Sequence, residues 1–363
     1  MNLKELSLLN FRNYTSSSFS FEPNSIHILC GKNAQGKTNL IEAVYYLSHL
    51  RSFRTNQMNS LIQTYKDYFR MEAQIENHGQ NQDLAVIVSQ QKKHLFLYKN
   101  PVNRYSDFVG VLNAVLFCPD DLMLFHQSPK NRRHFIDMEL IKLSHTYTKT
   151  LSHFQKILRY RNKLLKQEKI DDALLSIYTD QIIKDECIIM KQRSLFISQL
   201  MDRASQFYPL FSDKKEVIDA RYCTFVSDFS FDALKQVYDS HLEKDKRYHQ
   251  TNMGIHKDDI QFLLNGIPIA ECASQGQKRS FLLALKLGLV QIIKEKTQQY
   301  PILLLDDVFS ELDSNRKAQL IQHLPKDMQI FITTTEPVDA AWFTARSVHC
   351  YNVDQGQIQE VPL

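Results

Sequence analysis

The sequence predicts an α/β fold: a mixed β-sheet with covering helices, an antiparallel meander, and a second lobe that is helical. Strand and helix patterns alternate near both ends of the chain, as they do in a parallel sheet covered by helices. Three extended segments follow one another between residues 68 and 100, which indicates the meander. Between residues 138 and 206 the strand patterns stop, and apolar residues recur every three or four positions, which indicates helices.

Lobe I is the larger predicted part and comprises residues 1–137 and 207–363. Its predicted strands are short and apolar, and its predicted helices carry apolar residues at helical spacing. The strands are predicted within 1–30 and at 68–77, 83–90, 93–100, 301–307 and 328–335. The helices are predicted at 39–50 and 276–297. Residues 215–275 are predicted to be mixed strand and loop.

Lobe II, residues 138–206, is predicted to be a hairpin of two helices with a polar break at 166–172. Both arms carry apolar residues at helical spacing, and these are Leu151, Phe154, Leu158, Leu165, Ile182, Ile189 and Leu195. A short coiled-coil-like seam and the ordinary packing of two helices both fit this spacing. The segment is too short for a long coiled coil.

The composition excludes several classes of protein. No run of about 18 apolar residues exists, so no membrane-spanning helix and no membrane partner are expected. The N-terminus lacks the apolar core of a secretory signal, and we therefore expect a cytoplasmic protein. The six cysteines form no CxxC pair, so neither a disulfide framework nor a cysteine metal site is expected. A net charge of +4 permits a nucleic-acid partner but does not argue for one.

A glycine-rich segment, GKNAQGKT at 31–38, links a predicted strand to a predicted helix. Its spacing and its position between strand and helix are those of a phosphate-binding loop. Glycines let backbone N–H groups approach phosphates, and the following helix directs its positive end at the same anion. Lys37 would neutralise the β- and γ-phosphates, and the Thr38 hydroxyl would hold Mg²⁺. A plain glycine turn would leave Lys37 unexplained, so a nucleoside triphosphate site is predicted.

A second predicted strand ends in two acids, Asp306 and Asp307. Adjacent carboxylates at the end of a buried strand are costly unless a cation or a proton compensates them. Asp306 is therefore predicted to bind the metal, directly or through water, and Asp307 to orient the attacking water. Together with Lys37 these acids form the predicted catalytic set. A solvated strand end is the alternative.

The segment SQGQ, residues 274–277, stands at the beginning of the predicted helix 276–297. Lys278 and Arg279 follow in the first turn, where the helix dipole disfavours cations. An anion docked at this helix would relieve the conflict, whereas side chains that point into water are the alternative. Two anion-docking helix starts in one chain suggest head-to-tail pairing of two copies. Each phosphate loop would then be capped by the SQGQ segment of the other copy.

These motifs make the chain resemble ABC-type ATPases of the chromosome-maintenance branch, and among them the RecF family. The resemblance covers essentially the whole chain and rests on LSLLNFRNY (6–14), HLRSFRT (49–55), PDDLMLFHQSPKNRRHFID (119–137), GIHKDD (254–259) and LLLDDVFSELDSNRKAQL (303–320). It implies an ABC-type P-loop ATPase head with a helical lobe and no long coiled coil. From the motifs and the resemblance together, the residues predicted to bind ATP are Arg12, Gly31, Lys32, Asn33, Ala34, Gln35, Gly36, Lys37, Thr38, Asn39, Ser274, Gly276, Gln277 and Lys278.

The chain departs from the family pattern at a few positions. Gln127 stands in place of a glycine, and Ile255 and Lys257 replace the proline and arginine of the segment GPHRDD. Asp307 stands where most ABC ATPases have glutamate, so the acid is one methylene shorter and hydrolysis should be slow. The segment ITTTEP, 332–337, lacks the switch histidine of transporter ATPases.

The resemblance implies an ATP-dependent DNA-binding protein of recombinational gap repair and replication restart. ATP would close a homodimer on duplex DNA near single-stranded gaps, and weak, DNA-dependent ATP hydrolysis would reopen it. With RecR and RecO as partners, the dimer would promote the loading of RecA. A basic stripe within 153–169 is a candidate for contact with DNA phosphates, although a solvated helix face is the more common explanation. Its cations are Lys156, Arg159, Arg161, Lys163 and Lys166.

Three other functions fit parts of the sequence. The ATP-binding subunit of a transporter would share the phosphate loop and the SQGQ segment, but not the RecF-type segments. A P-loop kinase or transferase would not need the SQGQ helix. A non-catalytic scaffold would use ATP only as a structural ligand, and the short acid Asp307 leaves this possibility open.

Overall fold

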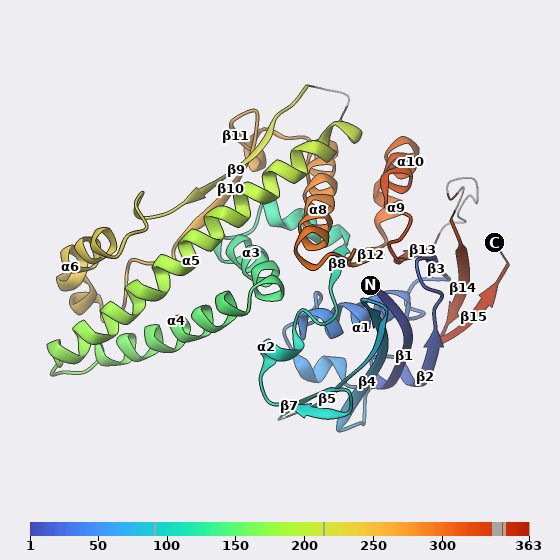
Figure 1. Cartoon of the computed structure of the whole chain (residues 1–363), viewed down its shortest axis with the longest axis horizontal. Helices are drawn as coiled ribbons and strands as arrows, with labels where there is room; N and C mark the ends of the chain where they lie inside the picture. Colours follow the sequence, from blue (N-terminus) through green and yellow to red (C-terminus); the bar gives the residue numbers. More distant parts are fainter. Residues whose placement is uncertain (91, 213–214, 336–342, 344–345, 363) are drawn as a thin grey trace. The chain divides into compact units, whose positions relative to one another are not determined.

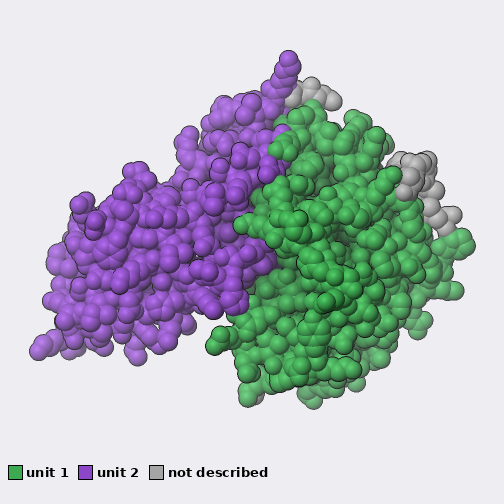
Figure 2. Space-filling view, in the orientation of Figure 1, with its two compact units in different colours: residues 1–121, 206–214, 282–363 green, residues 122–205, 215–281 purple. Residues whose placement is uncertain are grey.

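The computed structural model of the chain describes residues 1–90, 92–212, 215–335, 343 and 346–362. The chain divides into two compact units, which are coloured separately in Figure 2. Unit 1 comprises Met1–Asp121, Gln206–Lys214 and Leu282–Leu363, and unit 2 comprises Leu122–Ser205 and Lys215–Phe281. Unit 2 is thus larger than the helical hairpin predicted over 138–206, because residues 215–281 belong to it. Whether 138–206 acts as a lobe in its own right stays a prediction.

Unit 1 contains a six-stranded, largely parallel sheet in the order β15-β14-β3-β13-β12-β8. Its strands are β3 (Ile26–Cys30), β8 (Ala114–Phe117), β12 (Ile302–Asp306), β13 (Ile330–Thr334), β14 (Val348–Asp354) and β15 (Gln357–Val361). Only the edge pair β14–β15 is antiparallel. Every residue of β12 and β13 is buried, as expected for strands covered on both faces. The strands predicted at the two ends of the chain are confirmed.

A second six-stranded sheet of unit 1 is fully antiparallel, in the order β2-β1-β4-β5-β6-β7. Its strands are β1 (Asn2–Phe11), β2 (Tyr14–Ser20), β4 (Tyr68–Asn77), β5 (Gln80–Ser89), β6 (Lys93–Leu97) and β7 (Asn100–Val102). Along β4 the buried residues Phe69, Met71, Ala73 and Ile75 alternate with more exposed ones. One face of the sheet therefore packs on the core and the other meets solvent, and the predicted meander is confirmed.

Helix α1 (Lys37–His49) contributes to one hydrophobic core together with both sheets of unit 1. Its side chains at Leu40, Ala43, Val44 and Leu47 are fully buried. Helix α1, labelled in Figure 1, contacts β8, β12 and β13 of the largely parallel sheet. The shorter helices of this unit are η1 (Met58–Leu61), α2 (Tyr105–Phe108), η3 (Tyr208–Leu210), α9 (Val308–Glu311) and α10 (Ser314–His323). Both β3 and α1 are anchored in the core of unit 1, and only residues 31–36 connect them. The core therefore fixes both ends of this loop.

Unit 2 is built on the helices α3 (Pro129–Leu143), α4 (His145–Leu164), α5 (Asp172–Phe207) and α6 (Phe231–Tyr248). A small antiparallel sheet, β11-β10-β9, joins β9 (Ile218–Cys223), β10 (Asp259–Leu264) and β11 (Ile267–Pro268). The remaining elements are η2 (Pro119–Phe125), α7 (Ile269–Cys272) and α8 (Gln275–Thr297), and η2 and α8 each run from one unit into the other. Within the described residues, no helix has the length and the apolar content that crossing a bilayer would require.

Two predictions for unit 2 are wrong. Residues 231–248 form helix α6 rather than mixed strand and loop. Leu234, Val237, Tyr238 and Leu242 recur at helical spacing in this segment, so its pattern is helical and the prediction of strand and loop missed it. On α5, Leu195 is 59% exposed instead of lying in the seam, and Phe196 is buried beside it. The predicted break between the two arms is confirmed, because α4 ends at Leu164 and α5 begins at Asp172.

Candidate nucleotide-binding site

The glycine-rich loop connects the end of β3 to the beginning of α1, and two of its glycines adopt conformations that other residues rarely take. Gly31 has a φ of 144° and Gly36 a φ of 118°. A Cβ atom on Gly31 would lie 2.4 Å from the backbone oxygen of Val353 on β14. A Cβ atom on Gly36 would lie 2.7 Å from the side chain of Asn13. Glycine is therefore required at both positions by the fold itself.

Residues from both ends of the chain hold the loop in place. Asn13 donates a hydrogen bond from Nδ2 to the backbone oxygen of Gln35 at 3.0 Å, and the Tyr14 hydroxyl donates to the oxygen of Gly36 at 3.0 Å. The N–H of Gly356 donates to the oxygen of Gln35 at 3.0 Å. The N–H of Gln355 donates to Oε1 of Gln35 at 2.8 Å. Asn13 and Tyr14, the last two residues of the segment LSLLNFRNY, thus brace the loop.

Lys37 lies inside the curve of the loop and is only 8% exposed. Its Nζ donates hydrogen bonds to the backbone oxygens of Gly31 at 2.5 Å and Lys32 at 2.8 Å. Burial lowers the pKa of Lys37, and the carboxylates of Asp307 and Asp306 act in the opposite direction. A further negative group in the loop would favour the charged form of this lysine.

Two threonines hold the carboxylate at the end of β12. Thr38 Oγ1 donates to Oδ1 of Asp306 at 2.9 Å, and Thr333 Oγ1 donates to the same oxygen at 2.8 Å. Parallel pairing of β12 and β13 places Asp306 directly beside Thr333. Burial raises the pKa of Asp306, and the two hydroxyl groups partly counter this effect. The carboxylate is thus desolvated and oriented.

Asp307 takes a different position from its neighbour. Its backbone is left-handed, with a φ of 54°, and its N–H donates to Thr333 Oγ1 at 2.8 Å. Asp307 is exposed, whereas Asp306 is buried. The two adjacent acids therefore have separate surroundings, one enclosed by hydroxyl groups and one open to the pocket.

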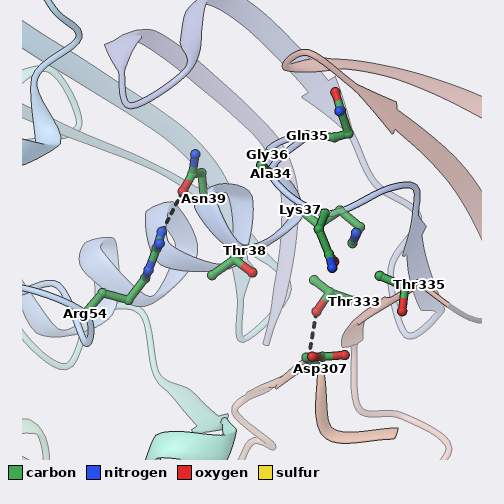
Figure 3. Close-up of a pocket in the computed structure, with 11 residues that line it drawn as sticks. Ala34, Gln35, Gly36, Lys37, Thr38, Asn39, Arg54, Asp307, Thr333 and Thr335 are labelled. Carbon is green, nitrogen blue, oxygen red and sulfur yellow. Dashed lines mark hydrogen bonds between the residues drawn. The ribbon is translucent and has the colours of Figure 1, made fainter. Parts of the chain in front are cut away.

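These residues line a polar pocket of about 290 Å³ in unit 1, shown in Figure 3. The lining residues are Asn33, Ala34, Gln35, Gly36, Lys37, Thr38, Asn39, Arg54, Asp307, Thr333 and Thr335. Seven of them, 33 to 39, are consecutive residues that the sequence predicted to bind ATP. The pocket thus brings backbone N–H groups, one buried lysine and the acidic end of β12 to the beginning of a helix. This is an arrangement suited to a phosphate chain.

Arg54 lines the pocket, although the sequence prediction did not include it. Its Nη1 donates to Oδ1 of Asn39 at 2.8 Å and lies 3.7 Å from the buried carboxylate of Glu42. Arg12, predicted to bind ATP, instead forms two hydrogen bonds to Glu42, at 2.9 and 2.8 Å, and one to the oxygen of Ser60. Arg12 is not among the lining residues, and its role in nucleotide binding stays a prediction. The segment HLRSFRT was the available signal for Arg54.

The donors at this pocket fit Mg²⁺. The Thr38 hydroxyl and the Asp306 carboxylate offer two hard oxygen ligands at hydrogen-bonding distance from each other. No group of three or more His, Cys, Asp and Glu side chains with metal-binding geometry occurs in the described part of the chain. Mg²⁺ bound with phosphates takes only one or two protein ligands and keeps several waters, so this donor set is sufficient.

The SQGQ segment begins helix α8 with reciprocal hydrogen bonds between Ser274 and Gln277. The N–H of Gln277 donates to Ser274 Oγ at 3.2 Å, and the N–H of Ser274 donates to Gln277 Oε1 at 2.7 Å. Ser274 is exposed, whereas Lys278 is only 5% exposed, so the alternative of a solvated Lys278 is wrong. Both residues belong to unit 2, as does Gly276. Their part in nucleotide binding stays a prediction.

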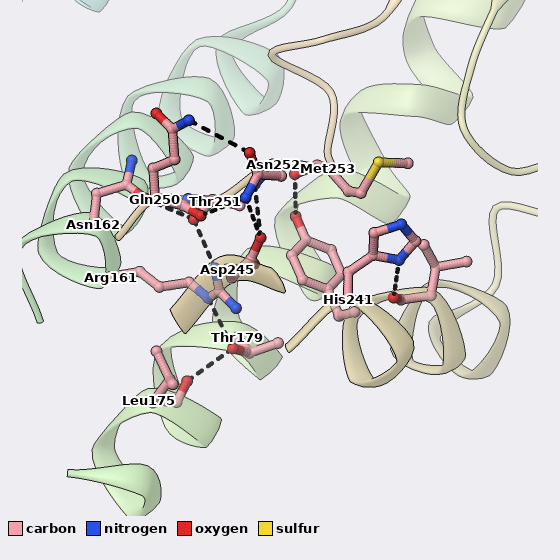
Figure 4. A network of polar contacts seen from close by, with 12 residues as sticks. Arg161, Asn162, Leu175, Thr179, His241, Asp245, Gln250, Thr251, Asn252 and Met253 are labelled. Carbon is pink, nitrogen blue, oxygen red and sulfur yellow. Dashed lines mark hydrogen bonds and ion pairs between the residues drawn. The ribbon is translucent and has the colours of Figure 1, made fainter. Parts of the chain in front are cut away.

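Arg161 on α4 is fully buried, which corrects its inclusion in the predicted DNA-binding stripe. Its Nη1 donates to Asp245 at 2.8 Å and to Thr251 Oγ1 at 2.7 Å, and its Nε donates to Thr179 Oγ1 at 3.0 Å (Figure 4). Asp245 comes from α6, so this cation ties two helices of unit 2 together. The sequence showed a basic residue but not its acidic partner far along the chain.

A second buried group of unit 2 is Glu186 on α5, which is fully buried. Its Oε1 accepts hydrogen bonds from the Tyr238 hydroxyl at 3.0 Å and from the N–H of Ile255 at 2.9 Å. Burial raises the pKa of Glu186 to about 8, because the charged form loses its hydration. Ile255 belongs to the segment GIHKDD, so this carboxyl group fixes the backbone of that segment from inside.

Known proteins share this chain's sequence and fold over almost its full length. The family model described as RecF/RecN/SMC N terminal domain matches residues 2–358. The chain is 36% identical over 370 residues to the DNA replication and repair protein RecF of Halalkalibacterium halodurans, covering 99% of this chain and 100% of that one. It is 33% identical over 365 residues to the RecF protein of Clostridioides difficile, covering 99% and 98%.

Solved structures give the same result. The structure of the recombination mediator protein RecF with ATP, in the RecFOR pathway, superposes with a TM-score of 0.91 at 30% identity, covering 99% of this chain and 97% of that one. The Smc head domain of Pyrococcus furiosus superposes with a TM-score of 0.57 at 15% identity, which shows a likeness of fold alone. The chain therefore has the mixed α/β head of SMC- and RecF-like ATPases. The segment ITTTEP, which has no switch histidine, is described only as far as Thr335. Its last two positions, 336 and 337, lie outside the described residues.

Proposed function

Because the chain belongs to the RecF family of the RecF/RecN/SMC ATPases, we propose that it is an ATP-dependent DNA-binding protein of recombinational gap repair and replication restart. The observation that carries the proposal is the hydrogen bond between Thr38 and Asp306 at 2.9 Å, inside a pocket built by the phosphate loop. It joins the two motifs that a nucleotide-driven member of this family needs. A solved relative named for its complex with ATP supports the same ligand.

ATP would bind with its phosphates in the pocket of unit 1. The backbone of residues 33–36 and the positive end of α1 would bind the phosphate oxygens, and Lys37 would exchange its bonds to Gly31 and Lys32 for bonds to phosphate. Thr38 and Asp306 would hold Mg²⁺, which neutralises phosphate charge when bound. Desolvation of Asp306 favours this role, because a cation removes the cost of burying the charged carboxylate.

Hydrolysis would be weak. Asp307 is exposed at the pocket and could orient a water molecule for attack on the terminal phosphate. It is one methylene shorter than the glutamate of most ABC ATPases, so its carboxylate reaches less far toward that water. Binding of ATP would then drive the change of state, and slow turnover would reset it.

A homodimer would form when ATP is bound. Ser274 and Gly276 of one copy would cap the terminal phosphate held by Lys37 of the other copy. Ser274 is exposed at the first turn of α8, as this role requires. We propose that the closed dimer binds duplex DNA near single-stranded gaps, and that RecR and RecO join it to promote RecA loading. The pathway named with the solved relative supports these partners.

Light scattering tests the proposal, with ATP, with ADP and without nucleotide, each in the presence and absence of duplex DNA. We expect a dimer with ATP only, and we expect that dimer to retain DNA. A monomer under every condition would contradict the proposal. A dimer that retains DNA but releases no phosphate from ATP would instead favour a non-catalytic scaffold, to which the short acid Asp307 points.

The variant Ser274→Arg tests the capping role separately. A long cationic side chain at this exposed position should block dimerisation and leave ATP binding by the monomer intact. Ser198→Arg, at an exposed position of α5, is the matched control and should dimerise normally. Loss of ATP binding by Ser274→Arg, or normal dimerisation, would show that Ser274 has another role.

A further inference from the structure

Helix α4 carries five lysine and arginine residues and no acidic residue over its 20 residues, His145–Leu164. Helices exposed to water usually mix charges of both signs, and α6 of the same unit does so. On α6, Lys235 is paired with Asp180 at 2.8 Å and Lys246 with Asp172 at 2.9 Å. The charge of α4 is therefore unlike that of an ordinary solvated face.

The cations of α4 are sorted between its two faces. The inward face is buried and includes Leu151, Phe154 and Ile157, and its one cation, Arg161, is neutralised by Asp245 (Figure 4). The outward face carries the other four cations, which are Lys149, Lys156, Arg159 and Lys163. None of these four forms an ion pair within the residues that the structure describes.

The outward cations form a continuous stripe. Lys149, Lys156 and Lys163 are seven residues apart, which places them on one side of the helix at steps of about 10 Å and over about 21 Å in all. That length corresponds to roughly six base pairs of duplex DNA. Tyr160 is 44% exposed within the stripe, and the Nζ of Lys156 lies 5.7 Å from the centre of its ring. The aromatic ring adds a flat surface among the charges.

We infer that this outward face of α4, defined by Lys149, Lys156, Arg159 and Lys163, binds the phosphate backbone of nucleic acid. The inference rests on the proposed DNA-binding function and names the surface that performs it in unit 2. Unpaired cations that repel one another gain most from a polyanion, because phosphates neutralise them and counterions are released. Contacts to phosphates carry no sequence information, so the binding is expected to be independent of sequence.

The test is the salt dependence of ATP-dependent binding to a fluorescent duplex, measured by anisotropy for the wild type and for Lys156→Gln/Lys163→Gln. Loss of two phosphate contacts should weaken binding roughly tenfold at physiological salt. It should also make the plot of log affinity against log salt shallower by about 2, at about 0.9 for each contact. Lys184→Gln/Lys191→Gln removes the same charge from exposed positions of α5 and should leave both quantities unchanged. Lys156→Arg/Lys163→Arg should bind like the wild type.

The outcomes separate the inference from the function on which it rests. If the wild type shows no ATP-dependent DNA binding, the proposed function fails. If the wild type binds DNA and Lys156→Gln/Lys163→Gln binds with the same affinity and salt dependence, this inference is overturned. It is equally overturned if that variant loses only a protein partner. Light scattering with ATP should show that the variant still dimerises, which excludes an indirect loss through assembly.

Discussion

The hydroxyl group of Thr38 donates a hydrogen bond of 2.9 Å to Asp306, which lies 268 residues further along the chain. Thr38 is in the first turn of α1 and Asp306 is the last residue of β12. The contact holds together the two oxygens that we propose as metal ligands, one from each motif. Binding of Mg²⁺ and a triphosphate, as proposed, would then need little reorganisation of these two side chains.

Asp306→Asn should separate metal binding from folding. The amide oxygen can still accept the hydrogen bonds of Thr38 and Thr333, and the buried charge is removed. We expect the unfolding temperature without ligand to be unchanged or higher. ATP with Mg²⁺ should stabilise the wild type by about 2.7 kcal/mol at a hundred times its dissociation constant. Thermal unfolding with ATP, with and without Mg²⁺, should show no Mg²⁺-dependent gain for the variant; an equal gain would show that Asp306 does not hold the metal.

Lys37→Arg should keep the positive charge and impair turnover. Lys37 is 8% exposed and lies close to the loop oxygens, so a planar guanidinium group cannot take the same position. We expect ATP to bind, and the rate of phosphate release to fall at least tenfold, which corresponds to about 1.4 kcal/mol of lost transition-state stabilisation. The exposed substitution Lys66→Arg is the control. Unchanged phosphate release by Lys37→Arg would mean that this lysine does not contact the reacting phosphate.

Gly31→Ala should destabilise unit 1 strongly. The new Cβ would meet the oxygen of Val353 at 2.4 Å, at a φ of 144°. We expect a loss of roughly 2–5 kcal/mol in the free energy of unfolding, from strain and overpacking together. Gly79→Ala is a matched control, because its φ is 73° and nothing lies within 4 Å of the new atom. The control should lose only about 1–2 kcal/mol. Denaturant unfolding compares the two, and equal losses would disprove the contact with Val353.

Glu186→Gln should change how stability depends on pH. The pKa of Glu186 is raised from 4.5 in the unfolded chain to about 8 in the fold. Between these values the folded protein keeps a proton that the unfolded chain has lost, so this residue makes stability fall as pH rises. The pKa of Asp258, raised to about 6 by burial, acts in the same direction. The pKa of His256, lowered to about 4 by burial, acts oppositely, and its contribution is lost as the pH falls.

Glutamine at position 186 can still accept the hydrogen bonds from Tyr238 and Ile255. We therefore expect Glu186→Gln to gain stability relative to the wild type as the pH rises from about 5 to 8. Denaturant unfolding at several pH values measures this difference, and Glu168→Gln, at an exposed position, is the control. Parallel pH profiles for the wild type and Glu186→Gln would show that the carboxyl group does not titrate in this range.

The phosphate loop and the two acids could be predicted because their signals are local. A strand, a glycine-rich turn and a helix follow one another within about 20 residues, and the physics of phosphate binding demands each residue type. The acids of β12 likewise follow directly on a buried strand. The meeting of Thr38 with Asp306 follows from the parallel sheet, since the carboxyl ends of its strands lie at one edge.

The positions of Arg161 and Arg54 could not be predicted in the same way. The sequence shows that residue 161 is basic, but it does not show that Asp245, 84 residues away, is its partner. The ion pair with Asp245 holds the Arg161 side chain on the inward face of the helix. Arg54 lies in a loop, where no periodicity reveals which side chains face the pocket. Helix α6 differs from these two residues, because Leu234, Val237, Tyr238 and Leu242 recur at helical spacing and could have indicated it. For Arg161 the missing information was a partner distant in the chain, and for Arg54 it was the course of the loop that carries it.

The contact of Gly31 with Val353 has a consequence for biosynthesis. The glycine-rich loop at 31–38 is translated long before the β14–β15 edge at 348–361 that shapes it. A polypeptide still emerging from the ribosome therefore has Gly31, Gly36 and Lys37 but not yet the β14 backbone against which Gly31 packs. If the proposed function holds, nucleotide binding should begin only after β14 and β15 have been added, and a chain that still lacks them should not pair with another copy.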